Sequence, residues 1–432
     1  MSNLTRRHFL TLAAGTAAAG MAGYYFLAPS TKKKVVIIGG GAGGVIAAKY
    51  IRKADTTIDV TLIEQNKHYY TCFMSNEVLS GERSIDSIKY SYDNLSSQHG
   101  VNMVYDRAIG IEPAAKKVRL HGGETIAYDR LIVSPGIDFR WEAIDGYDAN
   151  LIEKIPHAWK AGEQTIILRR QLEAMKDGGT VIIAPPPKPY RCSPAPYERA
   201  SQIAHYLKLE KPKSKVLILD ANQAFAKQAL FIEGWKKLYG YGTDNSLIEW
   251  IPSDQGGNIV SLDADQMTVY AGEFEDEHTA DVINIIPAQK AGRIAIESGL
   301  ADDSGWCPIN QKTFESTLHK DIHVIGDACI AGAMPKSGYS ANSQAKVCAQ
   351  AVISALQDTK MVEPSFVNTC YSVVGEDFAI SVTGIYRLKD GKIEVSQNAS
   401  GVSPLEASDQ YRKSEVAYAY SWYKNMTHDM FD

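Results

Sequence analysis

The stretch Val35-Val36-Ile37-Ile38-Gly39-Gly40-Gly41-Ala42-Gly43-Gly44 decides the fold of this 432-residue chain. Its four β-branched residues predict a buried strand. The glycines that follow fit the pattern G-x-G-x-x-G at Gly39, Gly41 and Gly44, and Ala47–Ile51 continues as a predicted helix. A strand, a glycine turn and a helix in this order bring backbone N–H groups to a pyrophosphate at the positive helix end. We therefore expect a dinucleotide-binding, Rossmann-like unit.

A second predicted strand, Asp59–Ile63, ends at Glu64, which lies twenty residues beyond Gly44. An acidic residue at this place can hold the hydroxyl groups of an adenosine ribose. The strand, the helix and the acidic residue therefore strengthen a glycine motif that would be weak evidence by itself.

Two later segments favour FAD over NAD as the dinucleotide. The stretch 128–136 is a short predicted strand that ends in Pro135-Gly136, and it resembles the second fingerprint of two-dinucleotide flavoproteins. The stretch 322–327 is a strand that ends in Gly326-Asp327. In that superfamily an aspartate at this place holds the ribityl chain of the flavin, so the resemblance assigns this role to Asp327.

A second Rossmann-like unit is predicted without a nicotinamide site. The expected strand, 179–184, runs into Pro185-Pro186-Pro187-Lys188-Pro189, and 216–220 is the next strand. Proline has no N–H group for a phosphate, and its ring restricts the backbone that would close the turn. We therefore expect the electrons to come from a donor other than NAD(P)H.

Composition excludes several classes of protein. Apolar residues make up 45% of the chain, and 45 basic residues against 50 acidic ones give a net charge of −5. No long arginine- or lysine-rich segment interrupts this balance, so we expect no nucleic-acid partner. The six cysteines are too few for a disulfide scaffold, and Cys307, Cys329 and Cys348 have no C-x-x-C or histidine spacing that would indicate a metal.

The first thirty residues are predicted to be a targeting segment. Arg6-Arg7 precedes a weakly apolar stretch from Leu10 to about Ala28, which is typical of a twin-arginine export signal. Export by this route implies a periplasmic protein that folds before it is exported. The alternative is an N-terminal membrane anchor, and whether the segment is cleaved is open. No later segment approaches about 20 uninterrupted apolar residues.

The motifs around the cysteines resemble the flavoprotein subunit of flavocytochrome c sulfide dehydrogenase, from about Val35 to the C-terminus. These motifs are YYTCFMSNEV (69–78), YRCSPAPYERASQ (190–202), GWCPIN (305–310), HVIGDACIAGAMPKSGYSANSQAK (323–346), NTCYSVV (368–374) and AYSWYKN (419–425).

This resemblance implies a covalent bond between Cys72 and the flavin 8α-methyl group, and a redox-active disulfide between Cys192 and Cys370. It also implies sulfide as substrate and a cytochrome c subunit as electron acceptor. The residues alone leave the cysteine pairing open, because any two of the six could pair. Cys72 lies eight residues beyond Glu64, so an extended segment can reach about 26 Å towards the flavin ring.

Hydrosulfide can open a disulfide by exchange, which leaves a persulfide on one cysteine and a thiolate on the other. Glu198, six residues after Cys192, is the candidate for proton handling, and a surface carboxylate in a first helical turn is the alternative. Lys336 is expected near the flavin head, where a cation would stabilise the reduced flavin. The remaining cysteines, Cys307, Cys329 and Cys348, are expected to be packed and reduced.

The predicted fold class is α/β, with two Rossmann-like domains of the glutathione-reductase type and a smaller C-terminal α+β domain. The expected boundaries are 1–30 for the export signal, 35–155 with 285–358 for the FAD domain, 156–284 for the second Rossmann-like domain and 359–432 for the C-terminal domain. Two other functions remain open, a sulfide:quinone reductase and a non-catalytic electron-transfer subunit. The first would need an amphipathic membrane-binding C-terminus, and the last 18 residues show no apolar face flanked by lysine or arginine.

Overall fold

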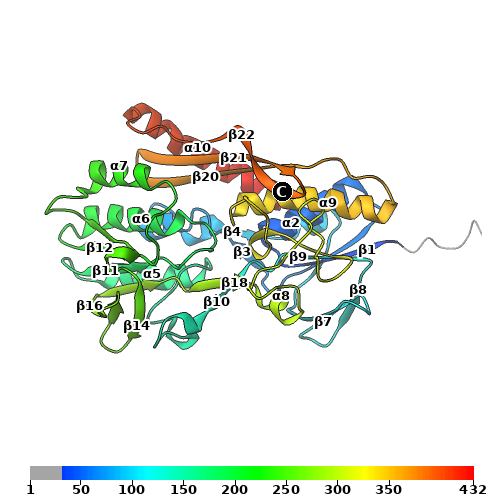
Figure 1. The fold of residues 1–432 in the computed structure, drawn as a ribbon, viewed down its shortest axis with the longest axis horizontal. Helices are drawn as coiled ribbons and strands as arrows, with labels where there is room; N and C mark the ends of the chain where they lie inside the picture. The colour runs from blue at the N-terminus through cyan, green and yellow to red at the C-terminus, as the bar shows by residue number, and fades with distance from the viewer. Residues whose placement is uncertain (1–31) are drawn as a thin grey trace, which may run out of the picture. The chain divides into compact units, whose positions relative to one another are not determined.

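The glycine-rich stretch joins a five-stranded parallel sheet to its first helix in the computed structural model, which describes residues 32–432. The strand order is β19-β9-β1-β2-β5. The bounds are β1 Lys34–Ile38, β2 Asp59–Ile63, β5 Asn102–Val104, β9 Arg130–Val133 and β19 Ile322–Val324. The apolar residues of β1 are all buried, as expected for a parallel strand covered on both faces. Helices α2 (Ala42–Ala54) and α9 (Gly338–Gln357) pack side by side (Figure 1).

A second parallel sheet follows, with the order β13-β12-β11-β17. Its strands are β11 Thr180–Ala184, β12 Lys215–Leu219, β13 Ile248–Ile251 and β17 Val282–Ile285. Its helices are α5 Glu163–Ala174, α6 Ala195–Glu210 and α7 Gln228–Tyr239. An antiparallel pair, β10 (Ile137–Arg140) and β18 (Ala288–Ala291), links this part to the first sheet.

Small antiparallel elements complete the two sheets. They are β3 His68–Tyr70 with β4 Lys89–Ser91; β6 Ala108–Glu112, β7 Lys117–Leu120 and β8 Thr125–Ala127; and β14 Ile259–Asp263, β15 Thr268–Ala271 and β16 Asp276–Thr279. The short helices are α3 Asn76–Ser80, α4 Asp93–Ser97 and α8 Arg293–Glu297.

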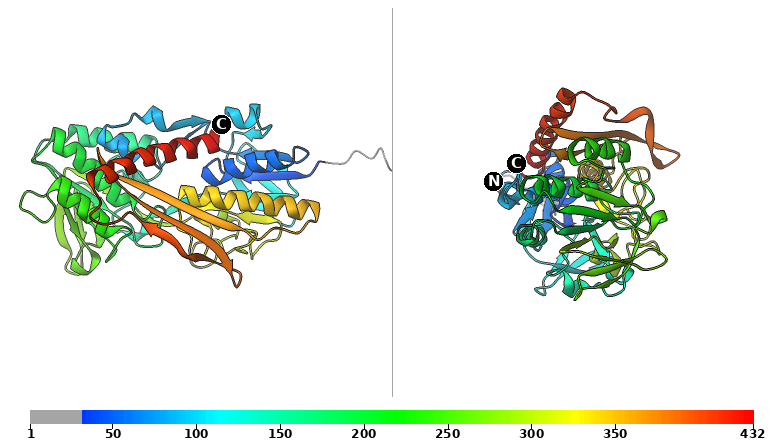
Figure 2. Two further views of the ribbon diagram at one scale, coloured as in Figure 1. Left: turned by 90° about the horizontal axis from the view of Figure 1, so that it is seen from above. Right: turned by 90° about the vertical axis from the view of Figure 1, so that its left-hand side faces the viewer.

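The C-terminal part is a three-stranded antiparallel sheet with one long helix. Its elements are β20 Ser365–Gly375, β21 Phe378–Lys389, β22 Lys392–Val402 and α10 Asp409–Phe431. Strand β20 contacts both α6 and α9, so this sheet lies across the two Rossmann-like parts (Figures 1 and 2). The predicted fold class is therefore confirmed, while the exact domain boundaries stay a prediction.

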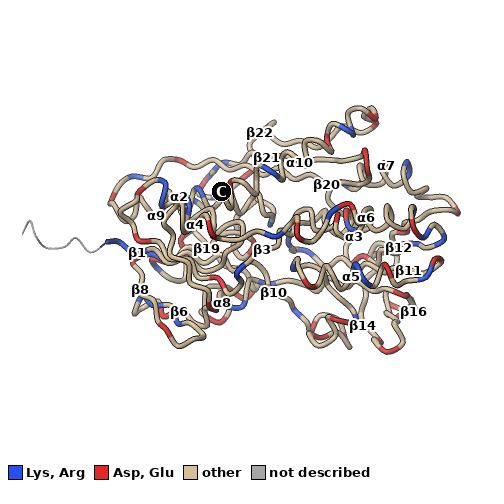
Figure 3. Tube along the Cα trace, turned by 180° about the vertical axis from the view of Figure 1, so that it is seen from behind, with Lys and Arg blue, Asp and Glu red and all other residues tan. Residues whose placement is uncertain are grey.

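Charged residues of both signs are interspersed along the described chain (Figure 3). Within residues 32–432, no helix combines the length and the apolar character that crossing a bilayer requires. The twin-arginine stretch lies outside the described residues, so the export signal stays a prediction.

Candidate active site

One cavity of about 690 Å³ lies where strands of the first sheet end and α6 begins. Ligands of open α/β sheets bind at such carboxyl ends of strands. The cavity brings together every candidate residue except Gly44 and Lys336. Its candidate lining residues are Gly39, Gly41, Glu64, Cys72, Pro135, Gly136, Cys192, Glu198, Gly326, Asp327 and Cys370.

The glycine turn forms one end of the cavity. Gly41 precedes α2 and has no side chain that caps the helix, so the first N–H groups of α2 are available to an anion. The carboxylate of Glu64 accepts a 2.8 Å hydrogen bond from the Gly40 N–H. Gly44 has a packing role, because a Cβ atom there would lie 1.8 Å from the Gly39 carbonyl oxygen.

Asp327 supplies the strongest sign that a polar group belongs in the cavity. Its Oδ1 atom is buried and has no hydrogen-bond partner in the described chain. Burial raises the pKa of Asp327, and the positive charges of Arg191 and Lys336 oppose this effect. A buried carboxylate without donors is costly, and the hydroxyl groups of a ribityl chain would satisfy it. The cavity, the glycine turn and Asp327 therefore fit FAD.

Lys336 does not line the cavity. Its ammonium group donates to the carbonyl oxygens of Asp327 at 2.7 Å and Cys329 at 2.9 Å, and it lies 3.8 Å from the centre of the Trp306 ring. These contacts fix the loop that presents Asp327. The side chain thus stabilises the loop of Asp327, and a role of Lys336 at the flavin head stays a prediction.

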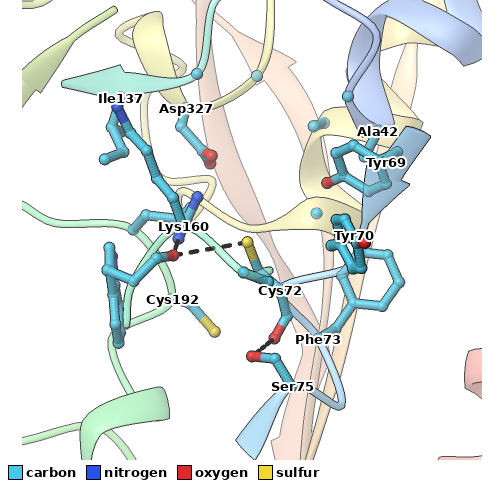
Figure 4. A pocket seen from close by; sticks show the side chains of 18 of the residues that line it. Ala42, Tyr69, Tyr70, Cys72, Phe73, Ser75, Ile137, Lys160, Cys192 and Asp327 are labelled. Carbon is cyan, nitrogen blue, oxygen red and sulfur yellow. Dashed lines mark hydrogen bonds between the residues drawn. The ribbon is translucent and has the colours of Figure 1, made fainter. Parts of the chain in front are cut away.

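Cys72 and Cys192 approach the cavity from different parts of the chain (Figure 4). The Cys72 sulfur lies 3.7 Å from the Trp159 carbonyl oxygen. Cys192 has a left-handed φ of 57°, and its N–H donates to the Lys336 carbonyl oxygen at 2.7 Å. This backbone hydrogen bond joins Cys192, three residues after the proline-rich segment, to the loop that carries Asp327.

Cys370 comes from β20 and faces the same cavity. Its sulfur lies 3.6 Å from Asn368 Oδ1, which also accepts a 2.6 Å hydrogen bond from the Ser337 hydroxyl. Burial raises the pKa of Cys192, and a negative charge on the neighbouring Cys370 raises it further. All six cysteines are free thiols in this structure, and Cys307, Cys329 and Cys348 are buried away from the cavity.

Glu198 lies in the first turn of α6, and its carboxylate faces the cavity and not the surface. One oxygen accepts a 2.9 Å bond from the Val373 N–H, and the other accepts a 3.0 Å bond from the Asn76 side chain. Burial raises the pKa of Glu198 to about 7. A carboxyl group with this pKa can both take up and release a proton at neutral pH.

The carboxyl ends of the second sheet are filled by protein groups. Asp220, at the place of a ribose-binding acid, accepts hydrogen bonds from Tyr197 at 2.6 Å and Trp250 at 2.9 Å. The cavity beside it, of about 200 Å³, is lined by Pro185, Pro186 and Pro187. The volume of this cavity is less than a third of that of the first one, although FAD and NAD(P)H are of similar size.

Three residues that shape the site were not predicted from the sequence. Asn76 orients Glu198, Trp159 contacts Cys72, and Lys227 binds Ser372, two residues after Cys370. The YYTCFMSNEV motif contained Asn76 without indicating its role, and no local signal marks Lys227. Among residues 32–432, no group of histidine, cysteine and acidic side chains is suited to a metal ion.

Three family models match the chain. The models are "Pyridine nucleotide-disulphide oxidoreductase" over residues 33–165, "Sulfide dehydrogenase [flavocytochrome c] flavoprotein chain, central" over 165–287 and "Flavocytochrome c sulphide dehydrogenase, flavin-binding" over 362–431. The fold and the cavity define a flavoprotein of the pyridine nucleotide-disulphide oxidoreductase class. Within that class, the chain belongs to the family of flavocytochrome c sulfide dehydrogenase flavoprotein chains.

Curated relatives and solved structures agree with this class. The chain is 25% identical over 293 residues to the mitochondrial sulfide:quinone oxidoreductase of Dictyostelium discoideum and 22% identical over 290 residues to that of Mus musculus. These matches cover 65% and 62% of this chain, but 62% and 59% of the relatives. The sulfide:quinone oxidoreductase of Aquifex aeolicus is 17% identical and has a TM-score of 0.69, with 92% of each chain covered. That structure supports the fold alone.

Proposed function

We propose that this protein oxidises sulfide and passes the electrons to a cytochrome c, in the periplasm after twin-arginine export. The observation that carries the proposal is the convergence of Cys72, Cys192 and Cys370 on the cavity that contains Asp327 and the glycine turn. The three cysteines come from separate parts of the chain, and only the three-dimensional fold brings them to one cavity. The other three cysteines are buried and do not line this cavity.

The chain's own residues would hold FAD along the cavity. The N–H groups at the start of α2 would bind the pyrophosphate, Glu64 the ribose and Asp327 the ribityl hydroxyl groups. Cys72 would bond covalently to the 8α position. A bound flavin supplies a two-electron acceptor that can release its electrons singly, which suits a haem partner.

Cys192 and Cys370 would form the disulfide that sulfide attacks. A sulfur–sulfur bond forms between hydrosulfide and one cysteine while the disulfide bond breaks, so the other cysteine leaves as a thiolate with the electron pair. Glu198 would take up the proton of the incoming sulfide, because its pKa of about 7 suits a base at neutral pH.

NAD(P)H is not expected to be the electron donor. Asp220 is already bonded to protein donors, and prolines line the small cavity at the carboxyl ends of the second sheet. Sulfide as donor agrees with the family of the chain and with the names of its curated relatives.

The test is anaerobic mixing of the holoprotein with sulfide, followed by flavin bleaching and by reduction of added cytochrome c. Cys192→Ser and Cys370→Ser should keep the flavin spectrum and lose at least 100-fold in turnover. Cys348→Ala, a buried cysteine in α9 that does not line the cavity, is the matched control. Near-wild-type turnover of either serine variant would refute the mechanism.

A quinone is the second candidate for the electron acceptor, because the relatives are named sulfide:quinone oxidoreductases. A parallel assay with a short-chain ubiquinone separates the two functions, because both share the disulfide and differ only in the acceptor. Faster turnover with the quinone than with cytochrome c would reassign the protein to the quinone-linked reaction.

A further inference from the structure

Lys227 is a half-buried cation beside the candidate disulfide that the proposed reaction has not used. It directly precedes α7 and has a left-handed φ of 61°. Its ammonium group donates to the Ser372 hydroxyl at 2.9 Å and reaches the Ile380 carbonyl oxygen at 3.5 Å. Both partners are neutral, so these hydrogen bonds hold the cation in place without neutralising its charge.

The strand β20 places this charge next to Cys370. Side chains two residues apart on a strand point to the same face, about 6.6 Å apart. Asn368, Cys370 and Ser372 therefore share one face of β20. The anchor of Lys227 on Ser372 keeps the ammonium group on the face that carries the Cys370 sulfur.

Four other titratable groups, on three surrounding elements and the segment before α6, lie near enough for their charge to act on Lys227. They are Cys370 on β20, Glu198 on α6, Cys192 just before α6 and Glu415 on α10. Burial lowers the pKa of Lys227, and the possible negative charge of each of these groups opposes that effect. Burial likewise raises the pKa of Cys370, and Lys227 is the strongest of the groups that oppose it. The two side chains are therefore coupled by charge.

We propose that Lys227 is a positioning residue that holds the negative charge of the Cys370 thiolate, so that sulfide adds to Cys192 and Cys370 is the leaving thiolate. The inference rests on the proposed function for its chemistry. In the step, hydrosulfide bonds to the Cys192 sulfur, the Cys192–Cys370 bond breaks, and the electron pair of that bond stays on Cys370. No further oxidant or reductant enters this step.

The first experiment needs no sulfide. The holoprotein is reduced with a water-soluble phosphine, and the rate of Cys370 alkylation by iodoacetamide is followed from pH 6 to 10 by peptide mass. Since only the thiolate reacts, Lys227→Met should slow the reaction at pH 8 by roughly tenfold and move the profile to higher pH. Lys227→Arg should restore most of the rate. Lys236→Met, at an exposed lysine of α7, should match the wild type.

Identical alkylation profiles of Lys227→Met and the wild type would overturn the inference. Ser372→Ala is the second variant, because it removes the anchor and keeps the lysine. It should slow the reaction roughly threefold, and if Lys227→Met does not fold, an unchanged rate in Ser372→Ala overturns the inference by itself. The flavin absorbance reports whether each variant retains the native cavity.

The second experiment locates the added sulfur. One equivalent of sulfide is added to the oxidised holoprotein, the products are trapped with iodoacetamide, and both cysteine peptides are analysed by mass. We expect the persulfide on Cys192 and a simple alkyl group on Cys370. A persulfide on Cys370 would refute the inference and leave the proposed function standing. No reaction with sulfide would refute the proposed function, while the alkylation profiles would still report on Lys227.

Discussion

Glu198→Gln tests whether the buried carboxyl group ionises as the structure indicates. Burial raises its pKa from an ordinary 4.5 to about 7, which corresponds to roughly 3 kcal/mol of coupling between ionisation and folding. Because the pKa is higher in the folded protein, the stabilisation is fully present below pH 4.5 and is lost as the pH rises through 7. About 2.5 kcal/mol of this loss falls between pH 5 and pH 8.

The side chain of the Glu198→Gln variant does not ionise, so the variant does not lose this stabilisation as the pH rises. Its amide oxygen can still accept from the Val373 N–H, but its NH₂ group faces the Asn76 NH₂ group, which bonds the second carboxylate oxygen in the wild type. That mismatch costs about 1 kcal/mol and is independent of pH. The change of stability with pH therefore isolates the ionisation of Glu198 from the loss of one hydrogen bond.

The assay is urea unfolding of the wild type and the variant at pH 5, 6.5 and 8. The free energy of unfolding of the wild type should fall relative to Glu198→Gln by about 2.5 kcal/mol between the first and last pH. Glu210→Gln, at the exposed end of the same helix, should run parallel to the wild type. Parallel curves for the wild type and Glu198→Gln would show that the carboxyl group is not desolvated as the structure indicates.

Two further predictions concern the cofactor and the electron donor. Cys72→Ala should still bind FAD, because the residues that contact the pyrophosphate and ribityl groups remain, but acid denaturation should release its flavin into the supernatant; equal release from the wild type would disprove the covalent bond. NADH should bleach the flavin at least 100-fold more slowly than sulfide does, since protein groups already satisfy Asp220; comparable rates in stopped-flow measurements would contradict this.

Local sequence determined the Rossmann-like elements. The β-branched run and the glycines at 39, 41 and 44 predicted β1 and α2 (Ala42–Ala54), and Asp59–Ile63 is β2 residue for residue. Such predictions succeed because hydrophobic periodicity and glycine turns act between near neighbours. The cysteine motifs likewise indicated the family, and the family models confirmed it.

The tertiary structure decided which of these residues meet. Cys192 and Cys370 are 178 positions apart, and they share a cavity only because β20 lies against α6 and α9. The same packing buries Glu198 and brings Lys227 to Ser372, whereas Lys336 turns towards backbone carbonyl groups. Burial and charge coupling depend on distances between residues that are remote in sequence, so no local pattern encodes them.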